Sequence, residues 1–259
     1  MQTRAQDRAQ PTGADIGSPQ VELNGVSYNA TPGQRPILVD GCDTIPKLFS
    51  VRCQQMSDRT AHREKDMGIW KSYSWRDYWD HAEKIGLGLM SLGLQRGEVV
   101  SILSEDRKEW LYLDMGIQGA GGIASGVYTT DSAQQLAYLI NDSGSRFLIV
   151  ENDEQLDKFL EIEADVPDLR HVIILDRDGL HDLQHEKCRF LDQLYDQGAA
   201  YRVANPDAFE IAVAQSRPDQ TALLIYTSGT TGQPKGAMLS HENILATMEA
   251  GARSLECLR

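Results

Sequence analysis

Residues 226–236 gather glycines, hydroxyl side chains and one lysine into a single short segment, which reads YTSGTTGQPKG. Gly229 and Gly232 allow backbone conformations that turn successive N–H groups toward an anion. Lys235 adds a compact positive charge, and Pro234 limits how far its backbone moves. Further donors come from the hydroxyls of Thr227, Ser228, Thr230 and Thr231. Together these groups predict a loop that binds phosphate.

Two other interpretations of this loop need to be considered. A Walker A loop also binds phosphate, but it requires Gly-Lys followed by Ser or Thr and then a helix. Here Pro234 precedes Lys235, Gly236 follows it, and the next segment is predicted as a strand, so motif and context both disagree. The second alternative is a glycine-rich hairpin without a ligand, because tight turns use the same residue types.

The segments on either side of the loop are expected to be strands. An apolar run at 222–226 leads directly into the loop, and residues 237–239 follow it as a second short strand. Ser240 then fits the N-cap of a final helix. We interpret His241 as a local helix-start residue, with contact to a ligand as the less favoured reading.

Upstream of the loop, strand and helix patterns alternate along the chain. Apolar runs predict strands at 99–103, 123–127, 147–150 and 172–175, and helical patterns run through Trp110 and Met115 and at 133–140, 154–163 and 209–215. Repeated strand–helix–strand units imply a parallel sheet. The predicted fold class is therefore α/β, with parallel β-sheets flanked by helices.

Polar residues mark the expected start of the helix that contains Trp110. Ser104 is predicted to cap it. Glu105 and Asp106 come next, where carboxylates favour the positive end of a helix dipole, and we prefer this role to that of a general acid and base pair.

The clearest helix begins after Ser74, a fitting N-cap, and ends before Gly93. Its apolar face is formed by Trp75, Tyr78, Trp79, Ala82, Ile85, Leu89 and Leu92. Three aromatic side chains on one stripe could line a ligand site, but such a stripe usually faces a core. We expect core packing.

The glycines of residues 119–124, GAGGIA, match the letters of a dinucleotide-binding fingerprint. The fingerprint should follow a strand and open a helix, whereas these glycines follow the helical stretch with Trp110. Close packing between a helix and a strand explains these glycines better than the dinucleotide-binding site of a dehydrogenase does.

His181, His185 and Cys188 fall in one short polar segment and could be metal ligands. A fourth ligand is missing and the spacing fits no usual zinc pattern, so we assign no metal site.

Composition limits the remaining possibilities. The 259 residues carry a formal net charge of -13 and no run of Lys and Arg, which argues against a nucleic-acid partner. The four cysteines lack paired short spacing, and no apolar run is long enough to span a bilayer, so we expect a cytoplasmic location. Residues 1–40 are polar and predict a disordered leader before a globular part at 41–259.

All eleven positions of residues 226–236 fit the signature of the adenylate-forming, or AMP-binding, superfamily, which the chain therefore resembles. The segments YSWRDY (73–78), LSEDRKEW (103–110), GVYTTD (126–131) and RPDQ (217–220) resemble the bacterial long-chain fatty-acid:CoA ligase branch.

This resemblance implies ATP-dependent activation of a fatty acid to an acyl-adenylate and then an acyl-CoA, releasing AMP and pyrophosphate. Thr227, Ser228, Gly229, Thr230, Thr231 and Gly232 would wrap the departing phosphates of ATP. Lys235 would neutralise their charge, Mg²⁺ would bridge them, and CoA would be the co-substrate. Peripheral membrane contact is compatible with such an enzyme.

The family's later motifs and small C-terminal domain have no counterpart in residues 41–259. We therefore expect an incomplete N-terminal domain that is inactive alone. The alternative is a truncated, non-catalytic fragment that binds a nucleotide or a partner.

Overall fold

The computed structural model describes residues 20–23, 26–29, 37–227 and 232–256. The chain divides into two units, Met1–Pro36 and Ile37–Arg259. In the first, the unpredicted strands β1 (Gln20–Leu23) and β2 (Val26–Asn29) pair antiparallel. The predicted leader at 1–40 lies mostly outside the described residues and stays a prediction. The second unit holds every other described element.

A seven-stranded sheet organises the second unit, in the order β11-β10-β6-β5-β7-β8-β9. Its strands are β5 (Val99–Leu103), β6 (Ile123–Val127), β7 (Phe147–Val150), β8 (His171–Ile174), β9 (Cys188–Phe190), β10 (Thr221–Thr227) and β11 (Lys235–Ser240). Six of them run parallel, and β11 returns antiparallel to β10. The predicted parallel sheet is confirmed, while the short strand β9 was not predicted.

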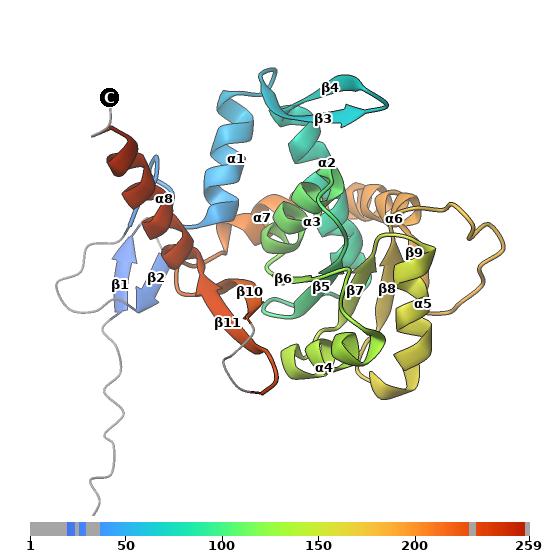
Figure 1. Ribbon diagram of the computed structural model, residues 1–259. Coiled ribbons are helices and arrows are strands. Elements are labelled where there is room, and N and C mark those ends of the chain that lie inside the picture. The colour runs from blue at the N-terminus through green and yellow to red at the C-terminus, as the bar shows by residue number, and fades with distance from the viewer. Residues whose placement is uncertain (1–19, 24–25, 30–36, 228–231, 257–259) are drawn as a thin grey trace, which may run out of the picture. The chain divides into compact units, whose positions relative to one another are not determined.

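Helices cover both faces of this sheet (Figure 1). On one face lie α4 (Ala133–Ser143) and α5 (Asp153–Ile162), which pack on Leu148 and Val150 of β7. On the other lie α2 (Trp75–Ser91), α3 (Lys108–Gly119) and α6 (Leu191–Ala204), packed on Phe147 and Ile149 of the same strand. Because β7 is buried on both faces, its sequence is a continuous apolar run.

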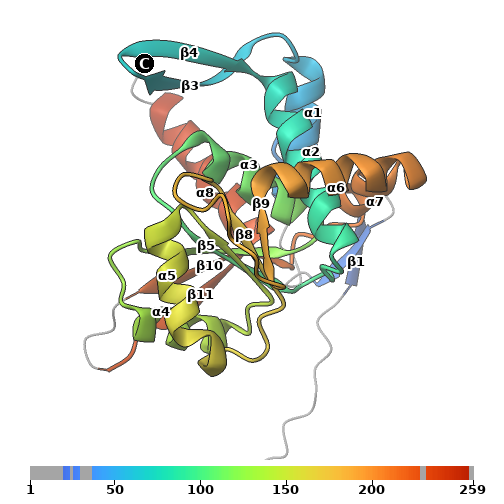
Figure 2. The same ribbon diagram turned by 90° about the vertical axis from the view of Figure 1, so that its right-hand side faces the viewer.

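The remaining described elements of the second unit surround this sandwich (Figure 2). They are α1 (Ile45–Gln55), β3 (Thr60–Asp66), β4 (Ile69–Ser74), the 3-10 turn η1 (Glu163–Asp165), α7 (Ala208–Ala214) and α8 (His241–Glu256). Strands β3 and β4 form a separate antiparallel hairpin. None of the helices in the described ranges is both long and apolar enough to cross a membrane.

The predicted helix after Ser74 is confirmed as α2. Ser74 accepts a hydrogen bond from the backbone N–H of Asp77, whose carboxylate accepts one from Ser74 N–H in return. The chain leaves the helix through Gly93 at φ +88°. The aromatic stripe packs with Phe49 of α1, as expected for a core contact.

The structure contradicts the predicted start of α3. This helix begins at Lys108 with Arg107 at the N-cap, so Ser104 does not cap it. Instead Ser104 donates a hydrogen bond of 3.2 Å to the carboxylate of Glu151, and this tertiary contact replaces the local one. Glu105 and Asp106 accordingly precede the helix and do not occupy its first turn.

The glycine-rich segment after α3 serves packing, as predicted. Gly119 is the last residue of α3, and a Cβ added there would lie 2.7 Å from Cε2 of the Phe209 ring. Gly121 has φ +88° and turns the chain toward β6. These glycines end a helix and open a strand, which is the reverse of a dinucleotide-binding arrangement.

Candidate active site

A cavity lies beyond the carboxyl ends of two neighbouring strands. The helices that follow these two strands lie on opposite faces of the sheet. Strand β5 leads into α3 on one face, and its neighbour β6 leads into α4 on the other. In open α/β sheets, ligands bind at such a switch point beyond the carboxyl ends of the strands. A cavity of about 520 Å³ occupies this position. It is lined by residues 104–106, 126–130 and 223–226, with Trp110 and Asp114 of α3.

The predicted phosphate loop leaves the sheet at the edge of this cavity. Leu223, Leu224, Ile225 and Tyr226 of β10 line the cavity, and the loop follows directly. Where the chain returns in β11, Lys235 lies opposite Thr227 in the strand register. Both flanking segments are strands, as predicted.

The described residues of the loop are open to solvent. Thr227, Gly232 and Lys235 are all exposed. Gly232 has φ +96°, a conformation that favours glycine. Ser228, Gly229, Thr230 and Thr231 lie outside the described residues, so their predicted contacts with phosphate remain a prediction.

Helix α4 holds both ends of the loop. The hydroxyl of Tyr226 donates a hydrogen bond of 2.7 Å to the carboxylate of Asp142. The hydroxyl of Tyr138, one helical turn earlier, donates one of 2.9 Å to the carbonyl of Pro234. Burial and the bond to Asp142 raise the pKa of Tyr226, so the phenol stays protonated and remains a donor. Sequence reasoning missed both helix residues.

Asp114 places a carboxyl group in the wall of the cavity. It is partly exposed and accepts a hydrogen bond of 2.7 Å from the side-chain amide of Gln118. Burial of the group raises its pKa to about 6. The nearby ring of Trp110 faces Gly126, where an added Cβ would lie 3.3 Å from Cζ2 of the ring. Asp114 was not among the predicted site residues.

The two loops that border the cavity are joined by polar contacts. The hydroxyl of Thr129, after β6, donates to the carboxylate of Glu105, after β5. Lys158 of α5 donates to the carbonyl of Thr129. The backbone N–H of Glu105 also donates to Glu151, at 2.7 Å. These contacts hold the rim, so Glu105 has a positioning role at the cavity.

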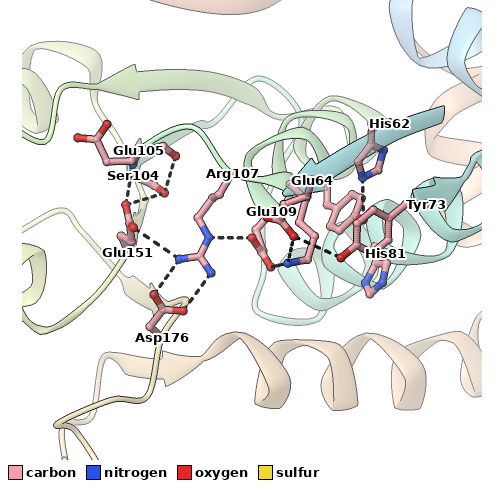
Figure 3. A network of polar contacts seen from close by, with 12 residues as sticks. His62, Glu64, Tyr73, His81, Ser104, Glu105, Arg107, Glu109, Glu151 and Asp176 are labelled. Carbon is pink, nitrogen blue, oxygen red and sulfur yellow. Dashed lines mark hydrogen bonds and ion pairs between the residues drawn. The ribbon is translucent and has the colours of Figure 1, made fainter. Parts of the chain in front are cut away.

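Arg107 is the centre of an ion-pair network beside the cavity (Figure 3). Its guanidinium donates two hydrogen bonds to Asp176, of 2.8 and 3.0 Å, and one of 2.7 Å to Glu109. Lys108 continues the network to Glu64 at 2.9 Å. Burial alone would raise the pKa of Glu109, but the hydrogen bond from Arg107 and the nearby cations lower it. Because these charges are paired, the network ties strand ends together and offers no free acid or base.

His185 and Cys188 do not form a metal site with His181. His185 Nε2 lies 3.1 Å from a carboxylate oxygen of Glu163. Burial raises the pKa of the Cys188 thiol to about 11. Within the described ranges, no group of three or more His, Cys, Asp and Glu residues could hold a metal ion.

His241 is the first residue of α8, as predicted, and lies far from the loop. Asn243 N–H donates to Ser240 Oγ at 3.2 Å, which confirms Ser240 as the cap. The backbone N–H of His241 bonds to Gln220, just before β10, whereas the loop leaves the opposite end of that strand. Burial lowers the pKa of His241 to about 4.

Comparison with known proteins identifies the family. The sequence profile described as AMP-binding enzyme matches residues 49–257. The chain belongs to the AMP-binding enzyme family. Its relatives include the long-chain-fatty-acid–CoA ligases ACSBG1 of Bos taurus, 32% identical over 85% of this chain, and ACSBG2 of Xenopus laevis, 34% identical over 82%. The chain spans about 30% of the first relative's length and about 28% of the second's.

Solved structures share the AMP-binding fold. An anthranilate CoA ligase, AuaEII, in complex with anthranoyl-AMP aligns with a TM-score of 0.64 at 26% identity, covering 77% of this chain and 35% of that one. A fatty acyl-adenylate ligase from L. pneumophila aligns at 0.58 and 17% identity, covering 80% of this chain and 32% of that one. At 17% identity, the likeness to the fatty acyl-adenylate ligase concerns the fold alone.

Proposed function

We infer that this chain carries the phosphate-binding part of an ATP-dependent acid:CoA ligase acting on long-chain fatty acids. The reaction is attack of the fatty-acid carboxylate on the α-phosphorus of ATP, which yields acyl-adenylate and pyrophosphate. The thiol of CoA then attacks the acyl carbonyl and releases AMP. The observation that carries this proposal is the position of Lys235, which is exposed and lies opposite Thr227, the residue after the cavity-lining Tyr226.

The residues present fit the proposed roles. Thr227 and Gly232 stand at the two sides of the loop, where exposed donors can meet the β- and γ-phosphates of ATP. We assign the same role to Ser228, Gly229, Thr230 and Thr231. Lys235 would neutralise the charge that develops as pyrophosphate leaves. When bound, Mg²⁺ would neutralise phosphate charge as well.

The choice of substrate rests on similarity. A long-chain fatty acid is proposed because the ACSBG relatives are long-chain-fatty-acid–CoA ligases and because segments of the sequence resemble that branch. A cytoplasmic location remains part of the proposal, in line with Cys42, Cys53 and Cys188, which are free.

Fatty-acid-dependent exchange of labelled pyrophosphate into ATP tests the proposal. The assay compares the chain with a form extended to the length of its relatives. We expect Lys235→Ala to lower exchange in the active form by about 10²- to 10³-fold, the usual effect of removing a group that stabilises developing charge. Lys84→Ala is the matched control, because Lys84 is an exposed lysine on α2. Unaltered exchange in Lys235→Ala would refute the role of the loop.

The same assay separates the alternative function. A chain that binds MgATP, while neither form exchanges pyrophosphate, would be a nucleotide-binding fragment without ligase chemistry.

A further inference from the structure

The tip of the β3–β4 hairpin exposes large apolar side chains. Met67 is 97% exposed, Ile69 68% and Trp70 63%. Figures 1 and 2 both show the hairpin at the periphery of the Ile37–Arg259 unit. Such side chains contribute nothing to the core, so folding alone does not explain them.

Met67 is also unfavourable for the turn that it occupies. The turn consists of Met67 at φ +44° and Gly68 at φ +84°. Two consecutive residues with positive φ mark the tight hairpin turn in which Asn-Gly and Asp-Gly are preferred. A methionine in the left-handed conformation destabilises the turn, and because the side chain is exposed, burial does not offset this cost. A function at the tip would account for it.

Charges are segregated between the two faces of the hairpin. In the strand register, Lys65 lies opposite Trp70 and Arg63 opposite Ser72, so these four residues share one face. The Lys65 ammonium lies 6.0 Å from the centre of the Trp70 ring, consistent with that placement. Arg63, Lys65 and Trp70 are exposed. This outer face therefore combines two cations with an aromatic ring and carries no carboxylate.

The carboxylates of the hairpin lie on the other face and are neutralised there. Glu64 pairs with Lys108 of α3 at 2.9 Å, and Asp66 pairs with Lys71 at 2.6 Å. Within the described ranges, neither Arg63 nor Lys65 has a carboxylate at ion-pair distance. The two cations of the outer face are thus available to an external anion.

We propose that the β3–β4 hairpin docks the protein on an anionic lipid surface. Met67, Ile69 and Trp70 would enter the interfacial layer, where tryptophan is favoured, and Arg63 and Lys65 would contact phosphate headgroups. A stable protein interface buries about 800 Å² on each partner, which a hairpin tip of a few residues does not supply. The inference goes beyond the proposed ligase activity and does not depend on it.

With a net charge of -13, docking on an anionic surface requires a local cationic face. An acidic protein is repelled by an anionic surface, but salt limits that repulsion to roughly 8 Å at physiological ionic strength. Contact through the hairpin places its cationic face nearest the anionic surface. The two cations and the apolar tip then supply the attraction locally.

Sedimentation with vesicles tests the proposal. The 259-residue chain is mixed with vesicles of equimolar phosphatidylglycerol and phosphatidylcholine, or of phosphatidylcholine alone. We expect binding to the anionic vesicles, weakened by added salt, and a blue shift of the tryptophan emission. Because the chain has four tryptophans, this shift should be lost in Trp70→Ser. Arg63→Gln with Lys65→Gln should weaken binding by about fivefold for each cation removed.

Variants of the apolar tip separate docking from folding. Met67→Asn suits the turn better than methionine does, so its loss of vesicle binding would not reflect unfolding. Val203→Ser, at a position 85% exposed on α6, and Lys84→Gln are matched controls that should bind as the parent chain does. Equal sedimentation with both vesicle types, or full binding by Met67→Asn with Trp70→Ser, would overturn the proposal. So would a hairpin-dependent dimer in sedimentation velocity without vesicle binding.

Discussion

Tyr226 and Asp142 join the start of the predicted phosphate loop to helix α4 through a hydrogen bond of 2.7 Å. Tyr138, one turn away on the same helix, holds the other side of the loop through the carbonyl of Pro234. The loop therefore spans two fixed points on one rigid element. Its described ends are positioned beside the cavity while Thr227 and Lys235 stay open to a ligand.

Removing the Tyr226 hydroxyl should loosen the start of the loop. Tyr226→Phe leaves the Asp142 carboxylate without its donor, and we expect unfolding to become easier by about 1–2 kcal/mol. In this variant, amide hydrogen exchange in β10 and β11 should be faster than in the parent protein, whereas exchange in β7 should be unchanged. In a double-mutant cycle with Asp142→Ala, urea unfolding should give a coupling energy of at least roughly 0.5 kcal/mol. Strict additivity would show that the contact is not formed.

His241 should make the fold sensitive to acid. Burial lowers its pKa to about 4 in the folded state, below the usual value of 6.5, so the unfolded chain binds more protons between these values. Its contribution to stability is complete above pH 6.5 and is lost as pH falls toward 4. His241→Gln should flatten this loss, which has an upper limit of roughly 3 kcal/mol. The free energy of unfolding of the parent chain and of His241→Gln is measured in urea between pH 4 and 6.5. The same pH dependence in both proteins would contradict this prediction.

Asp114 should have the opposite pH dependence. Burial raises its pKa from 3.8 to about 6, so the folded state binds more protons between those values and loses stability as pH rises. Asp114→Asn keeps an acceptor for Gln118 and removes the charge. We expect it to stabilise the fold by about 1–2 kcal/mol near pH 7, because solvent reaches this partly exposed residue, and by almost nothing below pH 3.8. A variant less stable than the parent near pH 7 would show that the carboxylate has a favourable partner.

Gly119 tests the packing role of the glycine-rich segment. Gly119→Ala places a methyl group against the Phe209 ring and should destabilise the fold by about 1–3 kcal/mol. Combining it with Phe209→Leu should recover part of the loss, since the smaller side chain makes room. Thermal melts of the single and double variants measure this. Stabilisation of the parent chain by NAD would instead favour the dinucleotide-binding alternative.

The parts of the fold that the sequence predicted are those with strong local signals. Strands β5 and β7 are buried on both faces, so their apolar runs gave the correct boundaries. Ser74 caps α2 through contacts three residues away, which a local pattern reveals. The hairpin of β3 and β4 was missed because β3 consists mainly of charged residues, and Ile69 and Trp70 of β4 are adjacent, so they do not alternate with polar residues as strand residues usually do.

Long-range contacts explain what was missed at the site. Tyr226 and Asp142 are 84 residues apart in the chain, and Tyr138 and Pro234 are 96 apart. Neither pair leaves a pattern in one sequence. Ser104 has the right residue type for a cap, but its hydroxyl bonds instead to Glu151, 47 residues away. Local propensity gave way there to tertiary structure.

Calorimetric titration with MgATP tests the central claim, that the loop ending at Lys235 holds the phosphates of ATP. The parent chain and Lys235→Ala are compared with Lys84→Ala, after urea unfolding has shown that all three are equally stable. We predict that Lys235→Ala binds MgATP at least about tenfold more weakly, since it loses a charged contact, and that Lys84→Ala binds as the parent does. Equal affinity of the parent chain and Lys235→Ala for MgATP would contradict the account.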